Sequence, residues 1–117
     1  MPATIITFSF EKKVAMKIQE MFNALGLTAE TVNQLLADVN LYNFQHPEKP
    51  MSVIALNADI DTITMTQMPL IGRAIAKERG REFLDDERKQ PLHFDTNAMR
   101  YGSLEVAKYY NAEHLFQ

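Results

Sequence analysis

Residues 22–36, with the sequence FNALGLTAETVNQLL, constrain the fold more than any other stretch of this chain. Gly26 separates two segments whose apolar residues recur at helical spacing, and glycine readily adopts the left-handed conformation that ends a helix. Thr28 follows at the position where a side-chain oxygen can accept a hydrogen bond from the first turn of the next helix. The stretch therefore predicts two helices joined by a tight turn.

The buried faces of these two helices follow from the same periodicity. The first stripe comprises Val14, Ile18, Met21, Phe22 and Leu25, and the second comprises Val32, Leu35, Leu36 and Val39. Residues three and four positions apart share one face of a helix, so each stripe marks a face that turns toward a core. We expect the two helices to pack as a pair.

Three other stretches have the pattern of strands. Residues 4–10 alternate between two faces, which is typical of a strand with one side against a core. Residues 51–57 and 60–67 are β-branched or alternating, and the polar stretch 57–59 suits a hairpin turn between them. The sequence thus predicts a small antiparallel sheet of about three strands.

Two further helices complete the expected order. Pro69 suits the first turn of a third helix, which either ends at Gly80 or continues through Leu84. A fourth helix is expected to start at Ser103, a capping residue. The order β-α-α-β-β-α-α, with helices on one face of the sheet, predicts an α+β fold in a single domain over residues 1–117.

The composition restricts the class of protein. The 117 residues are 46% hydrophobic and 23% charged, which is typical of one folded domain. No cysteine is present, so disulfides and thiolate metal sites are excluded. The net charge of -3 gives no long-range attraction to nucleic acid or anionic lipid. No apolar run approaches the ~20 residues that cross a bilayer, and no signal peptide is recognisable. We expect a cytoplasmic protein with no membrane partner.

The turn glycine Gly26, the cap Thr28 and the buried positions after it resemble the DNA-binding helix-turn-helix family. The resemblance implies a DNA-binding regulator that uses residues 21–40 and reads bases through Thr28, Thr31, Asn33 and Gln34. Phe22 departs from the alanine usual in that family four positions before the turn glycine. The second helix carries Glu30 and Asp38 and no lysine or arginine, so it would meet phosphates with the wrong sign. Nucleic acid is therefore the disfavoured partner.

Sequence motifs for catalysis and cofactor binding are missing. The four glycines are isolated, so no phosphate-binding loop exists, and no serine lies in a nucleophile elbow. The three histidines lack the spacing that places two metal ligands on one helical face. We therefore predict no catalytic, cofactor or metal site. A small enzyme or metal-binding protein with a site near His46, His93 and Asp95 is the second alternative.

By elimination, the sequence predicts a small non-enzymatic binding or regulatory protein that acts through a protein–protein surface. Aromatic residues are enriched in interface hot spots, and the predicted partner-binding residues near the C-terminus are Tyr101, Tyr109, Tyr110, Leu115 and Phe116. The same residues could instead close the domain's own core.

A row of small residues predicts a second kind of contact. Gly72, Ala76 and Gly80 follow an i, i+4, i+8 spacing and would let another backbone approach their helix closely. Packing within the chain is one use of such a row, and a two-fold contact between identical helices is another. A homodimer is therefore predicted.

Overall fold

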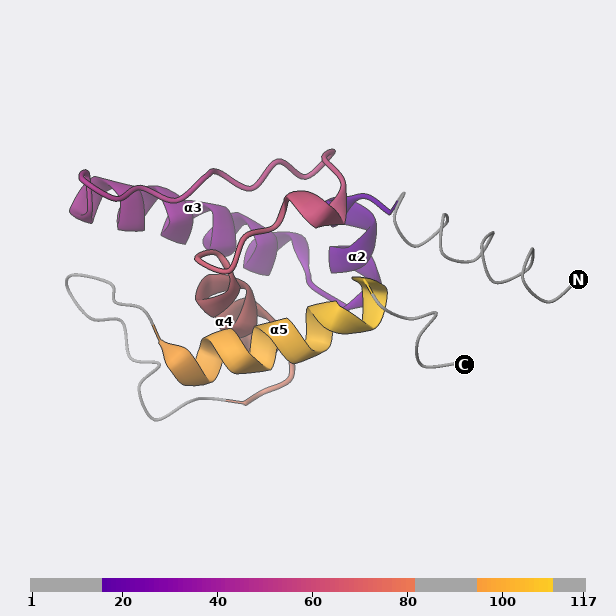
Figure 1. The fold of residues 1–117 in the computed structure, drawn as a ribbon. Coiled ribbons are helices and arrows are strands. Elements are labelled where there is room, and N and C mark those ends of the chain that lie inside the picture. Colours follow the sequence, from indigo (N-terminus) through magenta and orange to yellow (C-terminus); the bar gives the residue numbers. More distant parts are fainter. Residues whose placement is uncertain (1–15, 82–94, 111–117) are drawn as a thin grey trace, which may run out of the picture.

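A computed structural model of the chain describes residues 16–81 and 95–110, which fold as a set of helices (Figure 1). The helices are α2 (Ile18–Ala24), α3 (Ala29–Gln45), α4 (Met68–Glu78) and α5 (Thr96–Tyr110), and the short 3-10 helix η1 (Ile60–Thr62) precedes α4. In Figure 1, α4 packs between α3 and α5. The segment between α3 and η1 runs back along α3 toward α2.

The predicted α+β fold is wrong for the part of the chain that the structure describes. No strand is present in residues 16–81 or 95–110, where one isolated antiparallel bridge joins Lys17 to Asp59. The predicted strand at residues 4–10 lies outside the described residues. The predicted order β-α-α-β-β-α-α is replaced, within the described ranges, by α2-α3-η1-α4-α5.

The segment predicted as a β-hairpin, 51–67, is extended chain followed by a turn and η1. Its backbone pairs with helices instead of with a second strand. Asn43 of α3 accepts a hydrogen bond from the Met51 N–H at 2.7 Å and donates one to the Met51 carbonyl at 2.9 Å. The carbonyls of Leu56 and Ala58 accept hydrogen bonds from the first N–H groups of α2, both at 2.9 Å. Tertiary contacts thus override the β preference of this segment.

The prediction of two helices joined by a turn at Gly26 is confirmed, whereas the extensive contacts between helices in the described residues are those of α4 with α5 and of α3 with α4. Gly26 follows α2 with a φ of 83°, the left-handed conformation expected after a helix end. The Leu27 N–H bonds to the Phe22 carbonyl at 3.0 Å, and both side chains are buried. Thr28 then caps α3 by accepting a hydrogen bond from the Thr31 N–H at 3.3 Å.

One hydrophobic cluster joins the described helices. Its most completely buried side chains include Ile18, Met21, Phe22, Leu35, Val39, Ile60, Ile71, Ile75 and Val106. These residues come from α2, α3, η1, α4 and α5. The buried apolar residues of α2 and α3 are members of the two stripes that the sequence predicts, and Val32 and Leu36 pack against the same cluster.

Helices α4 and α5 meet backbone to backbone at two glycines. A Cβ atom on Gly72 would lie 2.0 Å from the carbonyl oxygen of Ala98, and one on Gly102 would lie 2.7 Å from that of Met68. Real Cβ atoms do not approach backbone atoms so closely, so both positions require glycine. The close crossing of α4 and α5 therefore depends on the absence of a side chain at both residues.

The predicted limits of α4 are confirmed, but the predicted start of α5 is wrong. Pro69 lies in the first turn of α4 as predicted, and α4 ends before Gly80, which has a φ of 65°. The predicted start of the last helix at Ser103 is wrong, because α5 begins at Thr96. Asp95 supplies the cap, with Oδ1 accepting hydrogen bonds from the first turn of α5. Within the described ranges, every helix is too short or too polar to span a bilayer.

Candidate functional site

The predicted aromatic surface near the C-terminus is engaged within the chain where the structure describes it. Tyr101 and Tyr109 are half-buried and pack against the hydrophobic cluster. The Tyr101 hydroxyl accepts a hydrogen bond from Arg79 at 3.1 Å, and the Arg81 guanidinium lies 4.6 Å from the centre of its ring. Outside the described side chains lie Tyr110, Leu115 and Phe116.

A group of paired charges surrounds Tyr101. Arg79 Nη1 lies 3.0 Å from Glu105 Oε1, and Lys108 Nζ lies 3.1 Å from the same oxygen. The hydrogen bond with Tyr101, followed by the one with Glu105, raises the pKa of Arg79. Burial alone would raise the pKa of Glu105, but the hydrogen bonds from Lys108 and Arg79 outweigh it and lower this pKa. The group therefore stays ionised at neutral pH and ties the end of α4 to α5.

The row of small residues was predicted to allow contact between two copies of the chain. Two of its three residues are instead buried within the chain. Gly72 and Ala76 are buried, and Gly72 contacts Ala98 and Gly102 of α5. Gly80 is exposed and lies just after α4. The close approach that this row permits is made by α5 of the same chain, and the homodimer remains a prediction.

Glu78, the last residue of α4, occupies the N-terminus of α3. One carboxylate oxygen, Oε1, accepts hydrogen bonds from the Thr28 N–H at 2.9 Å and from the Thr28 hydroxyl at 2.7 Å. Hydrogen bonds from Thr31 and from Thr28 lower the pKa of Glu78 to about 2. A negative charge at this end of a helix is favourable because the free N–H groups and the helix dipole face it. The contact fastens α4 to the start of α3.

Most of the side chains predicted to read DNA bases are therefore hydrogen-bonded or buried within the chain. Thr28 bonds to Glu78, Thr31 is buried, and Gln34 donates a hydrogen bond to Asp38 at 3.1 Å. Asn33 is exposed and makes no side-chain hydrogen bond within the described residues. Phosphates bind readily at free helix N-termini, and here a carboxylate of the same chain holds that position on α3.

We expect Glu78→Gln to lower the melting temperature at pH 7, because a neutral amide is a weaker acceptor at a helix N-terminus. A carboxyl whose pKa is lowered by folding stabilises the fold above its unfolded pKa, here 4.5, and the effect disappears as the pH falls toward 2. The difference between wild type and variant should therefore be largest at neutral pH and shrink below pH 4.5. Thermal unfolding followed by circular dichroism across this range measures it.

The control for this experiment is Glu48→Gln, which removes the same charge from an exposed residue outside the contact. It should leave the melting temperature close to that of the wild type at each pH. A Glu78→Gln difference that does not change with pH would contradict the ionic contact.

The residues of the metal or enzyme alternative have other roles in the structure. The His46 ring stacks on Tyr42 with centroids 4.1 Å apart, and its Nδ1 lies 2.9 Å from the Tyr42 carbonyl oxygen. Asp95 caps α5 and lies beside Arg73, whereas His93 is outside the described residues. Within residues 16–81 and 95–110, no group of three His, Asp or Glu residues is placed to hold a metal ion.

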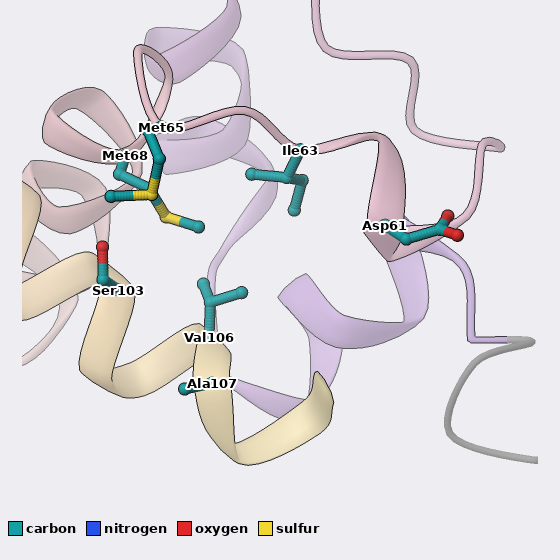
Figure 2. A pocket seen from close by; sticks show the side chains of 7 residues that line it. All are labelled: Asp61, Ile63, Met65, Met68, Ser103, Val106 and Ala107. Atoms are coloured by element: carbon teal, nitrogen blue, oxygen red, sulfur yellow. The ribbon is translucent and has the colours of Figure 1, made fainter. Parts of the chain in front are cut away.

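A pocket of about 250 Å³ lies between the segment before α4 and one face of α5 (Figure 2). We call it the methionine pocket, and its lining residues are Asp61, Ile63, Met65, Met68, Ser103, Val106 and Ala107. The residues of α5 share one face because they are spaced i, i+3, i+4. In Figure 2, Ile63 and Val106 point toward each other across the pocket, the two methionines lie at one end, and Asp61 lies at the other end with its carboxylate pointing away from Ile63 and Val106.

Met65 is an exposed apolar residue on a backbone turn that hydrogen bonds hold in place. It belongs to a turn in which the Gln67 N–H bonds to the Thr64 carbonyl at 3.1 Å. The buried Gln67 amide accepts a hydrogen bond from the Thr64 N–H and donates one to the Ser52 carbonyl, both at 2.8 Å. These bonds anchor the turn at both ends, so Met65 lies beside the pocket although 57% of its surface is exposed.

The opposite wall is fixed by the glycine crossing. Ser103 immediately follows Gly102, which contacts Met68 and Gly72 of α4. Met68 and Val106 are buried and form the apolar floor of the pocket. Sequence reasoning missed the pocket, because it placed the residues before α4 in a strand and started the last helix at Ser103.

The Ser103 hydroxyl in this wall has no hydrogen-bond partner within the described residues. Its oxygen, Oγ, is buried. A buried hydroxyl without a partner destabilises a fold, and serine is a poorer helix former than alanine. We expect Ser103→Ala to increase the free energy of unfolding by about 1 kcal/mol, as measured by urea denaturation. A clear decrease would show that the hydroxyl is hydrogen-bonded in the folded chain.

The methionine pocket differs from the other exposed apolar positions. The large apolar side chains that are exposed within the described residues are Phe44, Val53, Met65 and Leu104. Single exposed apolar side chains are common on protein surfaces. Met65 in addition lines a pocket with a buried floor, which makes the methionine pocket the candidate site.

Comparisons with protein-family models, with curated proteins and with solved structures found no match to this chain. The chemistry of its own surface therefore carries the functional interpretation.

Proposed function

We propose that this chain is a small non-enzymatic protein-binding module, and that a partner protein inserts an apolar side chain into the methionine pocket. The observation that carries the proposal is Met65, which is exposed but anchored beside a pocket whose floor, Met68 and Val106, is already buried. A backbone turn that is ordered before binding loses little conformational freedom when a partner covers it. Methionine is enriched at protein interfaces because it adapts to irregular shapes.

The size of the pocket favours a protein over a small molecule. Its volume of about 250 Å³ is below the roughly 300–1,000 Å³ typical of sites that enclose small ligands, and it is open to solvent. Burial of one large apolar side chain contributes roughly 1.5–3 kcal/mol, which alone gives weak binding. A protein partner supplies the remaining affinity through contacts around the mouth of the pocket.

Photo-crosslinking from the pocket tests this function. We expect p-benzoylphenylalanine at Met65, in the full chain and in the cells that produce it, to capture a protein identified by mass spectrometry. The same group at Asn40, an exposed position of α3, serves as the matched control and should not capture that protein. Ala107→Phe, which fills the pocket from α5, should abolish the crosslink while the melting temperature stays close to that of the wild type.

Two results would overturn the proposal. One is equal capture of the same proteins from Met65 and Asn40. The other is a crosslink from Met65 that persists when Ala107→Phe fills the pocket.

A further inference from the structure

An exposed carboxylate lies beside one end of the methionine pocket and points outward. Asp61 is exposed and makes no hydrogen bond or ion pair within the described residues. Asp59, two positions earlier, is different, because its Oδ1 lies 3.5 Å from Lys17 Nζ. The carboxylate at the pocket is therefore the one that remains available to a partner.

The other end of the pocket carries an unused hydroxyl. Ser103 Oγ is buried without a hydrogen-bond partner within the described residues, and in Figure 2 it points toward the end of the pocket that Met65 and Met68 close. The apolar Ile63 and Val106 separate this hydroxyl from Asp61. The pocket is thus apolar in its centre, with a buried hydroxyl behind one end and an exposed carboxylate outside the other.

We propose that the methionine pocket recognises a peptide segment that combines a large apolar side chain with a neighbouring lysine or arginine. This inference rests on the proposed function. The apolar side chain occupies the space between Ile63 and Val106, and the cation pairs with Asp61. A partner that covered Asp61 with apolar or acidic surface would leave a desolvated, unpaired carboxylate, which is unfavourable. Asp61 therefore selects the charge of the partner, while the apolar walls supply contact area.

The probe is a library of random 12-residue peptides displayed on phage and selected on the intact chain. We expect the enriched peptides to place a lysine or arginine within about four positions of a large apolar residue. Synthetic copies should bind the Asp61→Asn variant about tenfold more weakly in isothermal titration calorimetry. Glu48→Gln removes an equal charge from an exposed loop and should not change the affinity.

A charge exchange sharpens the test. Asp61→Lys should reject the selected peptides and bind copies in which glutamate replaces the basic residue. Asp61 makes no contact that the fold depends on within the described residues, so these variants should melt at the wild-type temperature.

The outcomes separate this inference from the proposed function. Peptides that lose binding in Ala107→Phe but bind Asp61→Asn with unchanged affinity would overturn the inference and leave the proposed function standing. Failure to enrich any peptide sensitive to Ala107→Phe would overturn both.

Discussion

Gly72→Ala is expected to destabilise the chain by about 3 kcal/mol or more, although alanine is normally the better helix residue by about 1 kcal/mol. The new Cβ would lie 2.0 Å from the Ala98 carbonyl oxygen and 2.9 Å from its carbonyl carbon. These are backbone atoms of α5, so no side-chain rotation can relieve the clash. The whole of α5 must move away from α4, which opens the close contact between the two helices. Urea denaturation followed by circular dichroism measures the loss.

Gly80→Ala is the matched control. It makes the same chemical change where nothing lies within 4 Å of the new Cβ, and only the φ of 65° is unfavourable for alanine. We expect it to cost about 1 kcal/mol. A Gly72→Ala variant that is as stable as the wild type would contradict the backbone contact between α4 and α5. The same variant should also weaken crosslinking from Met65, because displacement of α5 moves one wall of the methionine pocket.

Sequence alone predicted the features that depend on neighbouring residues. The turn at Gly26 could be predicted because a residue in the left-handed conformation commonly ends a helix. The cap at Thr28 could be predicted because a threonine hydroxyl commonly caps the helix that follows it. The start of α4 near Pro69 could be predicted in the same way, since a proline fits the first turn of a helix. Each of these signals acts within one turn of chain, so no knowledge of the tertiary structure was needed.

The features that sequence missed depend on residues far apart in the chain. The segment 51–67 has β-branched residues, but Asn43 and Gln67 supply the hydrogen bonds that a second strand would have made. Gly102 weakens the local preference for helix, and its contact with α4 explains why it is there. The methionine pocket requires both α5 and the turn at Met65, so neither segment predicts it alone.

The start of α5 is an instructive miss, because a local signal for it exists. Asp95 is one of the preferred residues at the first position before a helix, and its side chain accepts hydrogen bonds from the N–H groups of Asn97 and Ala98 at 3.0 and 3.1 Å. The predicted start was Ser103, another residue that commonly caps helices, which lies further along the same helix.

Asp95→Ala is expected to destabilise the chain by about 3 kcal/mol, because Asp95 has two roles. Its Oδ1 caps α5, and its Oδ2 lies 3.7 Å from Arg73 Nη2 of α4, with the two side chains 1% and 12% exposed. Loss of a cap costs about 1 kcal/mol, and removal of one member of a buried ion pair costs more, because Arg73 then loses one charge partner in a place that is shielded from water. Urea denaturation of the variant and the wild type at pH 7 provides the comparison.

Asp95→Asn separates the two roles, because asparagine caps helices about as well as aspartate but carries no charge. If the charge beside Arg73 dominates, this variant should lose most of the stability that Asp95→Ala loses. If the cap dominates, it should remain close to the wild type. The larger contribution is expected from the charge, since both partners are nearly removed from water and the attraction between them is weakly screened. An Asp95→Ala variant within about 0.5 kcal/mol of the wild type would contradict both roles, because a change that small is typical of a surface residue without partners.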